Sequence, residues 1–178
     1  MVFLEQGQPL QYDLGSGPVA CFYCDVNDAK EELAKAITET KLEGLDIIPF
    51  PMGDIYESRV QQKCMIIPGK KALTAAGAPE GSNPIGQQVP LFGCMQIMQE
   101  SQDGKKVLPL FMDFDEAQDA MELALKMDGG DATGFEVVGL SMERAVEQLA
   151  SVGETEEVPA YQFIPTASSL KHIEENLA

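Results

Sequence analysis

The chain has 178 residues, with 12 basic and 29 acidic side chains, so its formal net charge is −17 at pH 7. Its length fits one domain or two small halves, and a composition that is 44% hydrophobic and 23% charged is typical of a globular, soluble protein. The acidic excess argues against nucleic acid or an anionic membrane as a partner, because both would repel it, and leaves a basic protein surface as an option. No run approaches the roughly 18 apolar residues of a membrane span, and no signal or transit segment is visible.

The first half of the chain, residues 1–78, predicts alternating strands and helices. After a weak hairpin signal in the first residues, short apolar runs are bounded by turn formers, as buried strands are, and Asp25 can cap a helix. The expected strands are Val19–Cys24, Ile47–Ile48 and Cys64–Pro68, the apolar stripe of the first helix is Val26, Ala29, Leu33, Ala36 and Ile37, and shorter helices lie near Ile55–Glu57 and Leu73. A linker rich in Gly and Pro, residues 79–88, follows.

The second half, residues 89–178, begins with a predicted hairpin formed by Val89–Met98 and Val107–Phe114. Asp113 precedes a helix as Asp25 does, and an Ile-Pro pair ends the last strand in both halves, since proline cannot donate to a strand ladder. The remaining expected features are the helical stripe Phe114, Ala117, Met121, Ala124 and Leu125, a strand at Val137–Val138, a short helix near Ala145–Glu147, the strand Tyr161–Pro165, and a last helix with Leu170, Ile173 and Leu177 on one face.

The two halves match each other in order, which predicts an internal duplication. The first helical stripe recurs at an offset of 88 residues, Asp46–Met52 matches Glu136–Met142 at 90, and Cys64–Pro68 matches Tyr161–Pro165 at 97. The offsets grow along the chain as loop insertions would make them grow. We therefore predict an α/β fold of two internally repeated halves, each strand-helix-strand-helix-strand-helix, which share a mixed sheet with helices packed on it. The halves should be related by a pseudo-two-fold axis.

Cys21 and Cys24 have the two-residue spacing of redox and zinc motifs, but a four-thiolate zinc site needs a second such pair, which the chain lacks. Their counterparts in the other half are Pro109 and Met112, so the scaffold does not require thiols at these positions. We predict that the pair forms no disulfide and binds no metal. A thiol oxidoreductase remains the weaker alternative, because Cys24 adjoins a helix start, where a thiolate is stabilised.

No motif of a catalytic or cofactor site emerges from the sequence. A nucleophile elbow, a phosphate-binding loop and a His-Glu-x-x-His helix are all missing. Paired acidic residues fall on helix faces that we expect to be solvated, and the single histidine, His172, has no ligand spacing around it. The sequence therefore predicts a protein that is not an enzyme, with no cofactor and no metal.

Several short motifs of the second half, in their order along the chain, resemble the Tic-twenty-two-like family. They are Val89-Pro-Leu-Phe, Asp103-Gly, Val107-Leu-Pro-Leu-Phe, the helix start Asp113–Ala117, Val137-Val-Gly-Leu-Ser and Tyr161-Gln-Phe-Ile-Pro. The resemblance implies a soluble α/β protein of two related halves, located in the plastid intermembrane space or the bacterial periplasm, with a chaperone-like role for proteins in transit. The chain departs from the family pattern where Thr166-Ala follows the last motif.

These observations leave two hypotheses about function, both without catalysis. The first is a chaperone-like factor in plastid protein import that binds preprotein segments. The second is a structural adaptor, or a peripheral subunit of a plastid membrane (photosynthetic) complex, held at the membrane through a protein partner. The predicted hairpin carries apolar residues on both of its alternating faces, and an exposed apolar face marks an interaction site. We expect the partner to contact Phe92, Met98, Leu108 and Leu110, with the acidic surround favouring basic segments.

Overall fold

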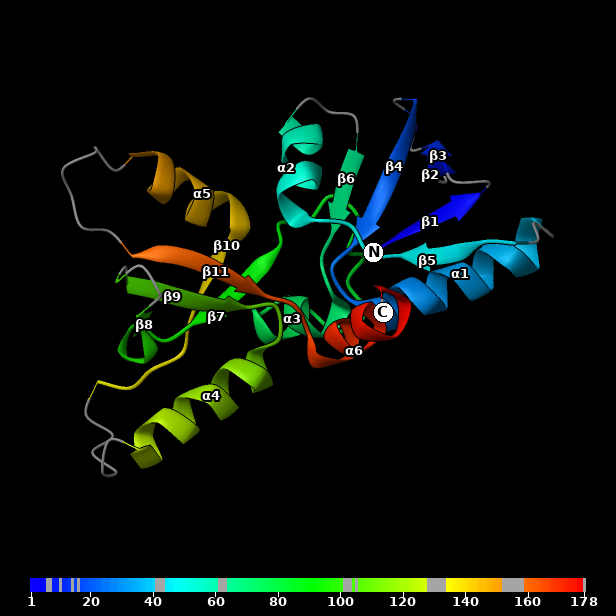
Figure 1. The fold of residues 1–178 in the computed structure, drawn as a ribbon. Helices are drawn as coiled ribbons and strands as arrows, with labels where there is room; N and C mark the ends of the chain where they lie inside the picture. The colour runs from blue at the N-terminus through cyan, green and yellow to red at the C-terminus, as the bar shows by residue number, and fades with distance from the viewer. Residues whose placement is uncertain are drawn as a thin grey trace. The chain divides into compact units, whose positions relative to one another are not determined.

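The computed structural model forms two compact units, each a mixture of helices and strands (Figure 1). The first unit comprises Met1–Lys70, Asn83–Gln87 and Ala167–Ala178, and the second comprises Lys71–Ser82 and Gln88–Thr166. The residues that the structure describes are 1–5, 8–9, 11–13, 15, 17–40, 44–60, 64–100, 104, 106–127, 134–151 and 159–177. The mixed α/β class predicted from the sequence is confirmed.

The first unit is built from short strands and from helices that connect them. Its elements are β1 (Val2–Glu5), β2 (Gln8–Pro9), β3 (Gln11–Asp13), β4 (Pro18–Tyr23), α1 (Val26–Thr40), β5 (Asp46–Ile48), α2 (Met52–Val60), β6 (Cys64–Ile67) and α6 (Ala167–Leu177). The strands form two sheets, with the orders β2-β1-β5 and β3-β4-β6. Only β4 and β6 pair in parallel among these described strands. A parallel pair needs a long crossover, and the chain from α1 to α2 supplies it.

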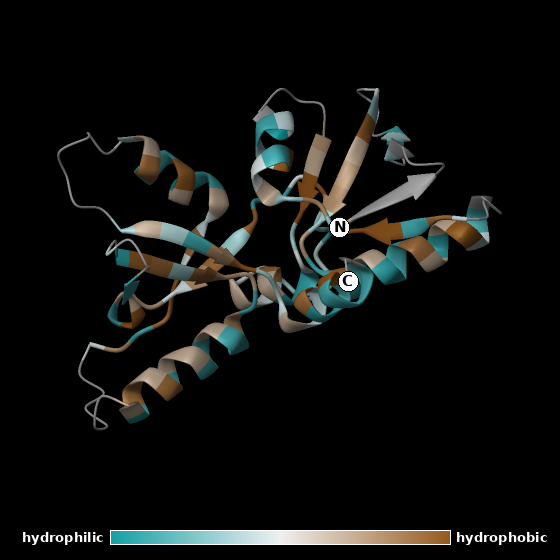
Figure 2. Cartoon of the chain, in the orientation of Figure 1, coloured by the Kyte–Doolittle hydropathy of each residue, from teal (hydrophilic) through white to brown (hydrophobic). Residues whose placement is uncertain are grey.

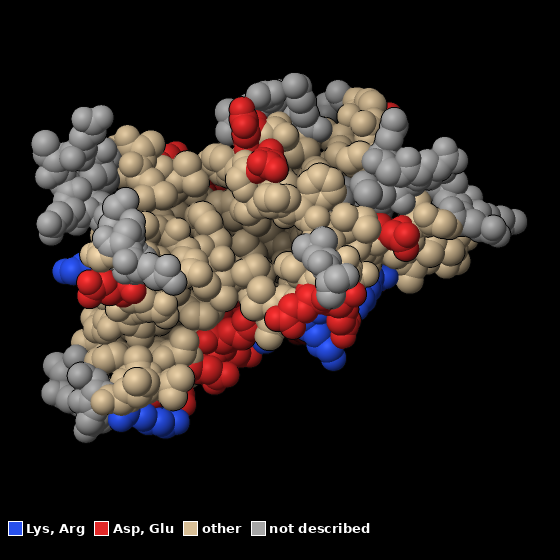
Figure 3. Space-filling model, viewed as in Figure 1, with Lys and Arg blue, Asp and Glu red and all other residues tan. Residues whose placement is uncertain are grey.

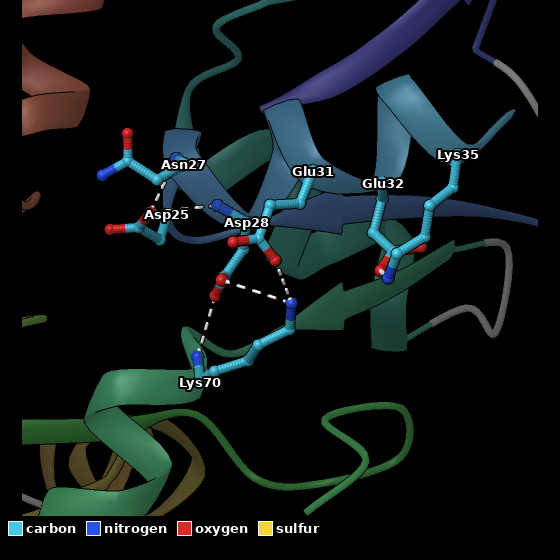
Figure 4. Close-up of polar contacts among 7 residues, drawn as sticks. All are labelled: Asp25, Asn27, Asp28, Glu31, Glu32, Lys35 and Lys70. Carbon is cyan, nitrogen blue, oxygen red and sulfur yellow. Dashed lines mark hydrogen bonds and ion pairs between the residues drawn. The ribbon is translucent and has the colours of Figure 1, made fainter. Parts of the chain in front are cut away.

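Asp25 caps helix α1, and the first apolar residues of the helix are buried. Its Oδ1 accepts the backbone N–H groups of Asn27 at 2.7 Å and of Asp28 at 3.2 Å, as a helix cap does (Figure 4). Val26 and Ala29, which follow on the inward face, are buried together with Ile47. The predicted stripe is therefore confirmed at its start, whereas Ile37, three turns along, is exposed.

Helix α6 belongs to the first unit although it ends the chain. The buried hydroxyl of Ser169 accepts the backbone N–H of Val26 at 3.1 Å, so it satisfies a donor at the start of α1. Nε2 of His172 lies 3.1 Å from the carbonyl oxygen of Ile47, to which it can donate, and Ile173 packs against the core of this unit. The single histidine thus has a structural role between α6 and β5.

The second unit has one mixed sheet among its described residues. Its elements are α3 (Lys70–Ala75, of which Lys70 lies in the first unit), β7 (Pro90–Gly93), the 3-10 helix η1 (Met95–Ile97), β8 (Gln99–Glu100), β9 (Lys106–Phe111), α4 (Phe114–Met127), β10 (Val138–Ser141), α5 (Met142–Ser151) and β11 (Ala160–Ile164). The strand order is β10-β7-β9-β11, with β8 paired to β9. β9 and β11 are parallel, and the other pairs are antiparallel.

Burial of β7 determines the packing of the second unit. All four of its residues are buried, so both alternating sets of side chains are covered. Phe92 meets Ala72 and Ala117 in the core, and its ring contacts that of Phe114 edge to face, with 5.4 Å between ring centroids. A Cβ atom at Gly93 would lie 2.8 Å from Cδ2 of Leu110 and 3.3 Å from the carbonyl oxygen of Pro109, so a side chain there would require the buried Leu110 to shift.

Two parts of the predicted fold are wrong. No described sheet contains strands of both units, so the expected shared mixed sheet does not form. The predicted strand Val89–Met98 is not continuous, because η1 interrupts it after β7, although both β7 and the short β8 pair antiparallel with β9 as the predicted hairpin requires. The sequence divides the chain at 1–78, 79–88 and 89–178, and in the structure most of α3 lies in the second unit and α6 lies in the first.

Asp113 joins α3 to α4 within the second unit. Its Oδ1 accepts the backbone N–H groups of Asp115 (2.8 Å) and Glu116 (3.2 Å), and its Oδ2 accepts Nζ of Lys71 at 2.8 Å. Lys71 also lies 2.9 Å from Oδ2 of Asp115. Burial alone would raise the pKa of Asp113, but the Lys71 ammonium and the two amide donors outweigh it and hold this pKa below its usual value.

Replacing Asp113 with Ala should therefore lower the free energy of unfolding by about 1–2 kcal/mol, because the helix cap and the Lys71 contact are lost together. Asp113→Asn keeps an oxygen for the cap and should cost less. Urea unfolding followed by circular dichroism measures both. Equal stability of Asp113→Ala and the wild type would contradict the assigned role.

The Asp113 contribution should also depend on pH with a defined sign. Because the folded pKa lies below the unfolded value of about 3.9, the stabilisation is present above that value and is lost as the pH falls toward the folded pKa. The stability difference between the wild type and Asp113→Asn should be constant near neutral pH and shrink below about pH 4. Urea titrations across this range test it; a difference that grows on acidification would contradict the linkage.

Candidate protein-binding groove

The structure separates the four residues that the sequence predicted as a binding surface. Phe92, Leu108 and Leu110 are buried within the second unit, with only 2% of Phe92 exposed, whereas Met98 is 40% exposed. β7 and β9 lie in the interior of the sheet order, and α4 packs on both, so their side chains form the core. The expectation that Phe92, Leu108 and Leu110 form an exposed patch with Met98 is therefore wrong.

Met98 instead lines a groove that residues of η1, β9 and α4 form together. This hollow, here called the α4 groove, has a volume of about 760 Å³. Residues after β7, two side chains of β9 and one stripe of α4 form its walls; they are Gln96, Ile97, Met98, Gln99, Pro109, Phe111, Ala120, Leu123, Ala124, Met127 and Phe135. Figure 2 shows that apolar residues gather toward the C-terminal end of α4. The groove is thus mainly apolar, with glutamines along one side.

Helix α4 supplies the groove because its sequence is apolar on more than one face. Ala120, Leu123, Ala124 and Met127 follow the spacing i, i+3, i+4, i+7, which places them on one stripe. Ala117, on the inward face, is buried in the core instead. Leu123 is 61% exposed and Met127 is 82% exposed, so these two side chains are largely uncovered by the described part of the chain, whereas Ala120 and Ala124 are half-buried.

A second hollow lies beside Phe92 in the same unit. Its volume is about 470 Å³, and residues of α3, β7 and β10 line it together with Gln88, Phe114 and Val137. Its floor is the Phe92–Phe114 ring pair, whose Phe92 is buried. Because Phe92 offers little surface, the α4 groove presents the larger exposed apolar area to a partner.

The charges on α4 are mostly acidic. The helix carries Asp115, Glu116, Asp119 and Glu122 against the single basic residue Lys126. Figure 3 shows acidic side chains gathered beside the N-terminal part of α4 and a basic side chain at its C-terminal end. A partner that uses the groove therefore meets a predominantly negative helix, which favours a basic segment.

The polar cluster at the start of α1 has a structural explanation. The backbone N–H of Lys70 donates to Oδ2 of Asp28 at 2.8 Å, and its Nζ lies 2.6 Å from Oε2 of Glu31 and 3.7 Å from Oδ1 of Asp28 (Figure 4). Burial raises the pKa of Asp28, against the lowering effect of Lys70, while the Lys70 contact lowers the pKa of the exposed Glu31. These contacts hold Lys70, the first residue of α3, against the start of α1.

The cysteines occupy positions that disfavour thiol chemistry. All four are free thiols, with Cys21 and Cys64 buried in neighbouring strands. Burial first, and then the nearby Cys64, raises the pKa of Cys21 to about 11, so its thiol is protonated at neutral pH. Cys24 donates its backbone N–H to the carbonyl of Ile67 at 2.9 Å. Cys21 therefore lacks the lowered pKa that the attacking thiol of a redox motif needs.

The described residues contain neither a cluster of metal ligands nor a membrane-spanning helix. Within them, no three His, Cys, Asp or Glu side chains come close enough to hold a metal ion. None of the described helices combines the length and apolar character needed to cross a bilayer.

Comparison with known proteins identifies the fold. No family model and no curated protein matches the sequence. Among solved structures, Tic22 from Plasmodium falciparum matches with a TM-score of 0.72 and 18% identity, over 97% of this chain and 91% of that chain. Anabaena Tic22, described as a protein of protein transport, matches with a TM-score of 0.69 and 16% identity, over 98% and 90%. The chain therefore has a Tic22-like fold over nearly its whole length, as the sequence resemblance predicted.

The free energy of unfolding of two variants tests whether Phe92 belongs to the core and Leu123 to the exposed groove. Phe92→Ala should lower the free energy of unfolding by about 3–5 kcal/mol, because it empties a packed site. Leu123→Ser should change it by less than about 0.5 kcal/mol, since the side chain already faces solvent. Chemical unfolding of the two variants measures the difference. A large loss for Leu123→Ser would show that the stripe is covered.

Proposed function

We propose that this chain is a protein-binding module without catalytic activity that acts in protein transport. In this proposal the α4 groove holds apolar segments of a client protein, as a chaperone-like factor would. The observation that carries the proposal is the uncovered stripe of Leu123 and Met127, which faces a groove also lined by Met98. Large exposed apolar patches on a folded protein mark interaction sites, and flexible thioether side chains adapt to varied partners.

The proposed client is a basic, amphipathic segment. Its apolar face would lie in the α4 groove, and its basic residues would face Asp119 and Glu122, both exposed on α4. The net charge of −17 supports the same preference, because it attracts basic segments over long range and repels acidic ones. This would also keep a loaded protein apart from other copies of itself.

A plastid location, in the intermembrane space or at the periphery of a plastid membrane, follows from the resemblance to the Tic-twenty-two-like family. The fold shared with Tic22 of Plasmodium falciparum and Anabaena supports this location and a role in import. The alternative role is a stable adaptor or peripheral subunit of a plastid membrane complex, which would use the same groove for one permanent partner. The two roles differ in how fast the partner leaves.

The internal duplication remains a proposal about the origin of the fold. Ala29 and Ala117, which the sequence match pairs, are both buried, each in a helix whose start is capped by an aspartate. Each helix also follows the strand that pairs in parallel with a later one, β4 with β6 and β9 with β11. An experimental structure in which these elements do not superpose in order would contradict the duplication.

Binding of a synthetic peptide tests the proposed function. A fluorescent amphipathic peptide, with leucines on one face and lysines on the other, should bind the wild type, and Leu123→Ser/Met127→Ser should weaken binding at least about tenfold, since each buried apolar side chain contributes roughly 1.5–3 kcal/mol. Ile37→Ser is the matched control, because Ile37 is an exposed apolar residue of α1 in the other unit. Fluorescence anisotropy gives the affinities.

Two further comparisons complete this experiment. The same peptide with glutamates in place of lysines should bind more weakly at low salt, and raising the salt to about 1 M, where the Debye length is near 3 Å, should reduce the difference. Equal binding by the wild type and the double variant would refute the groove as the site. Retention of a native partner over hours, with slow dissociation, would favour the adaptor role.

A further inference from the structure

The exposed methionines of this chain are concentrated in the second unit. Met127 is 82% exposed, Met95 is 48% exposed and Met98 is 40% exposed, while Met112 and Met142 in the same unit are buried. Met98 lies between η1 and β8, and Met127 is the last residue of α4. Both line the α4 groove. Met95 lies on η1 and is not among the described residues that line it.

We infer that Met98 and Met127 are a modification site at which oxidation closes the α4 groove to apolar ligands. A hydroperoxide transfers one oxygen atom to the thioether sulfur; the O–O bond breaks, an S–O bond forms, the sulfur loses two electrons, and the peroxide is reduced to water or an alcohol. The product, methionine sulfoxide, is polar and chiral. Oxidation of Met98 and Met127 therefore places two hydrated polar groups on the groove wall, and an apolar ligand would have to remove their water in order to bind. The modification is reversible by methionine sulfoxide reductases.

The surroundings of the two sulfurs support this assignment. Access decides which methionines react, because thioether oxidation needs no change of protonation state, and these two side chains face solvent on a groove wall. Their apolar neighbours Ile97, Leu123 and Phe135 have no side-chain polar atom to compensate a sulfoxide, so only the amides of Gln96 and Gln99 among the groove's side chains could donate to it. The consequence for a client rests on the proposed function, whereas the modification and the change of the groove do not.

Site-resolved mass spectrometry after brief treatment with hydrogen peroxide measures the modification. Met127 and Met98 should be converted well before Met142 and Met112, with Met95 also reacting early because it is exposed. Conversion of Met98 and Met127 no faster than that of Met142 would overturn the inference, since it would mean that the groove sulfurs are not accessible in the folded protein.

Nile red, a neutral apolar dye, reports on the groove without assuming a protein client. Peroxide should weaken dye binding to the wild type by at least about tenfold, and Met98→Leu/Met127→Leu, which keeps the apolar volume but not the sulfur, should retain its affinity. Met95→Leu is the matched control and should lose affinity as the wild type does. Incubation of the oxidised wild type with both sulfoxide reductases should restore binding without any substitution.

The outcomes separate this inference from the proposed function. If the wild type binds Nile red but not the basic peptide, and loses the dye on oxidation, the proposed function fails and the modification site stands. If oxidation leaves dye binding unchanged, or weakens the Met98→Leu/Met127→Leu variant as much as the wild type, the inference is wrong. Absence of dye binding before oxidation would overturn it too, because the groove would then not be an apolar site.

Discussion

Complete burial of β7 is the constraint on which the second unit depends. Its two alternating sets of side chains are covered. At Gly93 a side chain would collide with Leu110. The most apolar segment of the unit therefore offers no surface to a partner. Exposed apolar area remains where α4 extends beyond its contact with the sheet, at Leu123 and Met127. Packing of the core thus determines where binding can occur.

Much of the local structure could be predicted from the sequence because it depends on local physics. Asp25 and Asp113 cap the helices that follow them, and β6 and β11 each end at the isoleucine before a proline, as expected. Which unit receives α3 and α6 could not be predicted. Helix α3 directly follows β6, and α6 directly follows β11, so sequence order assigns each helix to the unit of its strand. The contacts that decide otherwise join residues far apart in the sequence, such as the backbone N–H of Val26 and the hydroxyl of Ser169. The separate sheets of the two units could not be predicted for the same reason.

The site was harder to predict than the fold. The sequence correctly showed that the β7 region is apolar on both alternating faces, but it does not say which faces the unit itself covers. Met98 was named for its position in an expected strand and lines the groove because η1 interrupts that strand. Leu123 and Met127 were missed although a signal existed: together with Ala120 they widen the apolar face of α4 beside Ala124, which belongs to the stripe assigned to the core.

Methyl NMR of the protein with labelled methionine and leucine side chains tests the central claim most directly. On titration with a basic amphipathic peptide, the account predicts that the methyl signals of Met98, Leu123 and Met127 shift first. Those of the buried Leu91 and Met142 should stay in place. Shifts confined to other methyl groups, with Met98, Leu123 and Met127 unchanged at saturation, would contradict the assignment of the α4 groove as the binding surface.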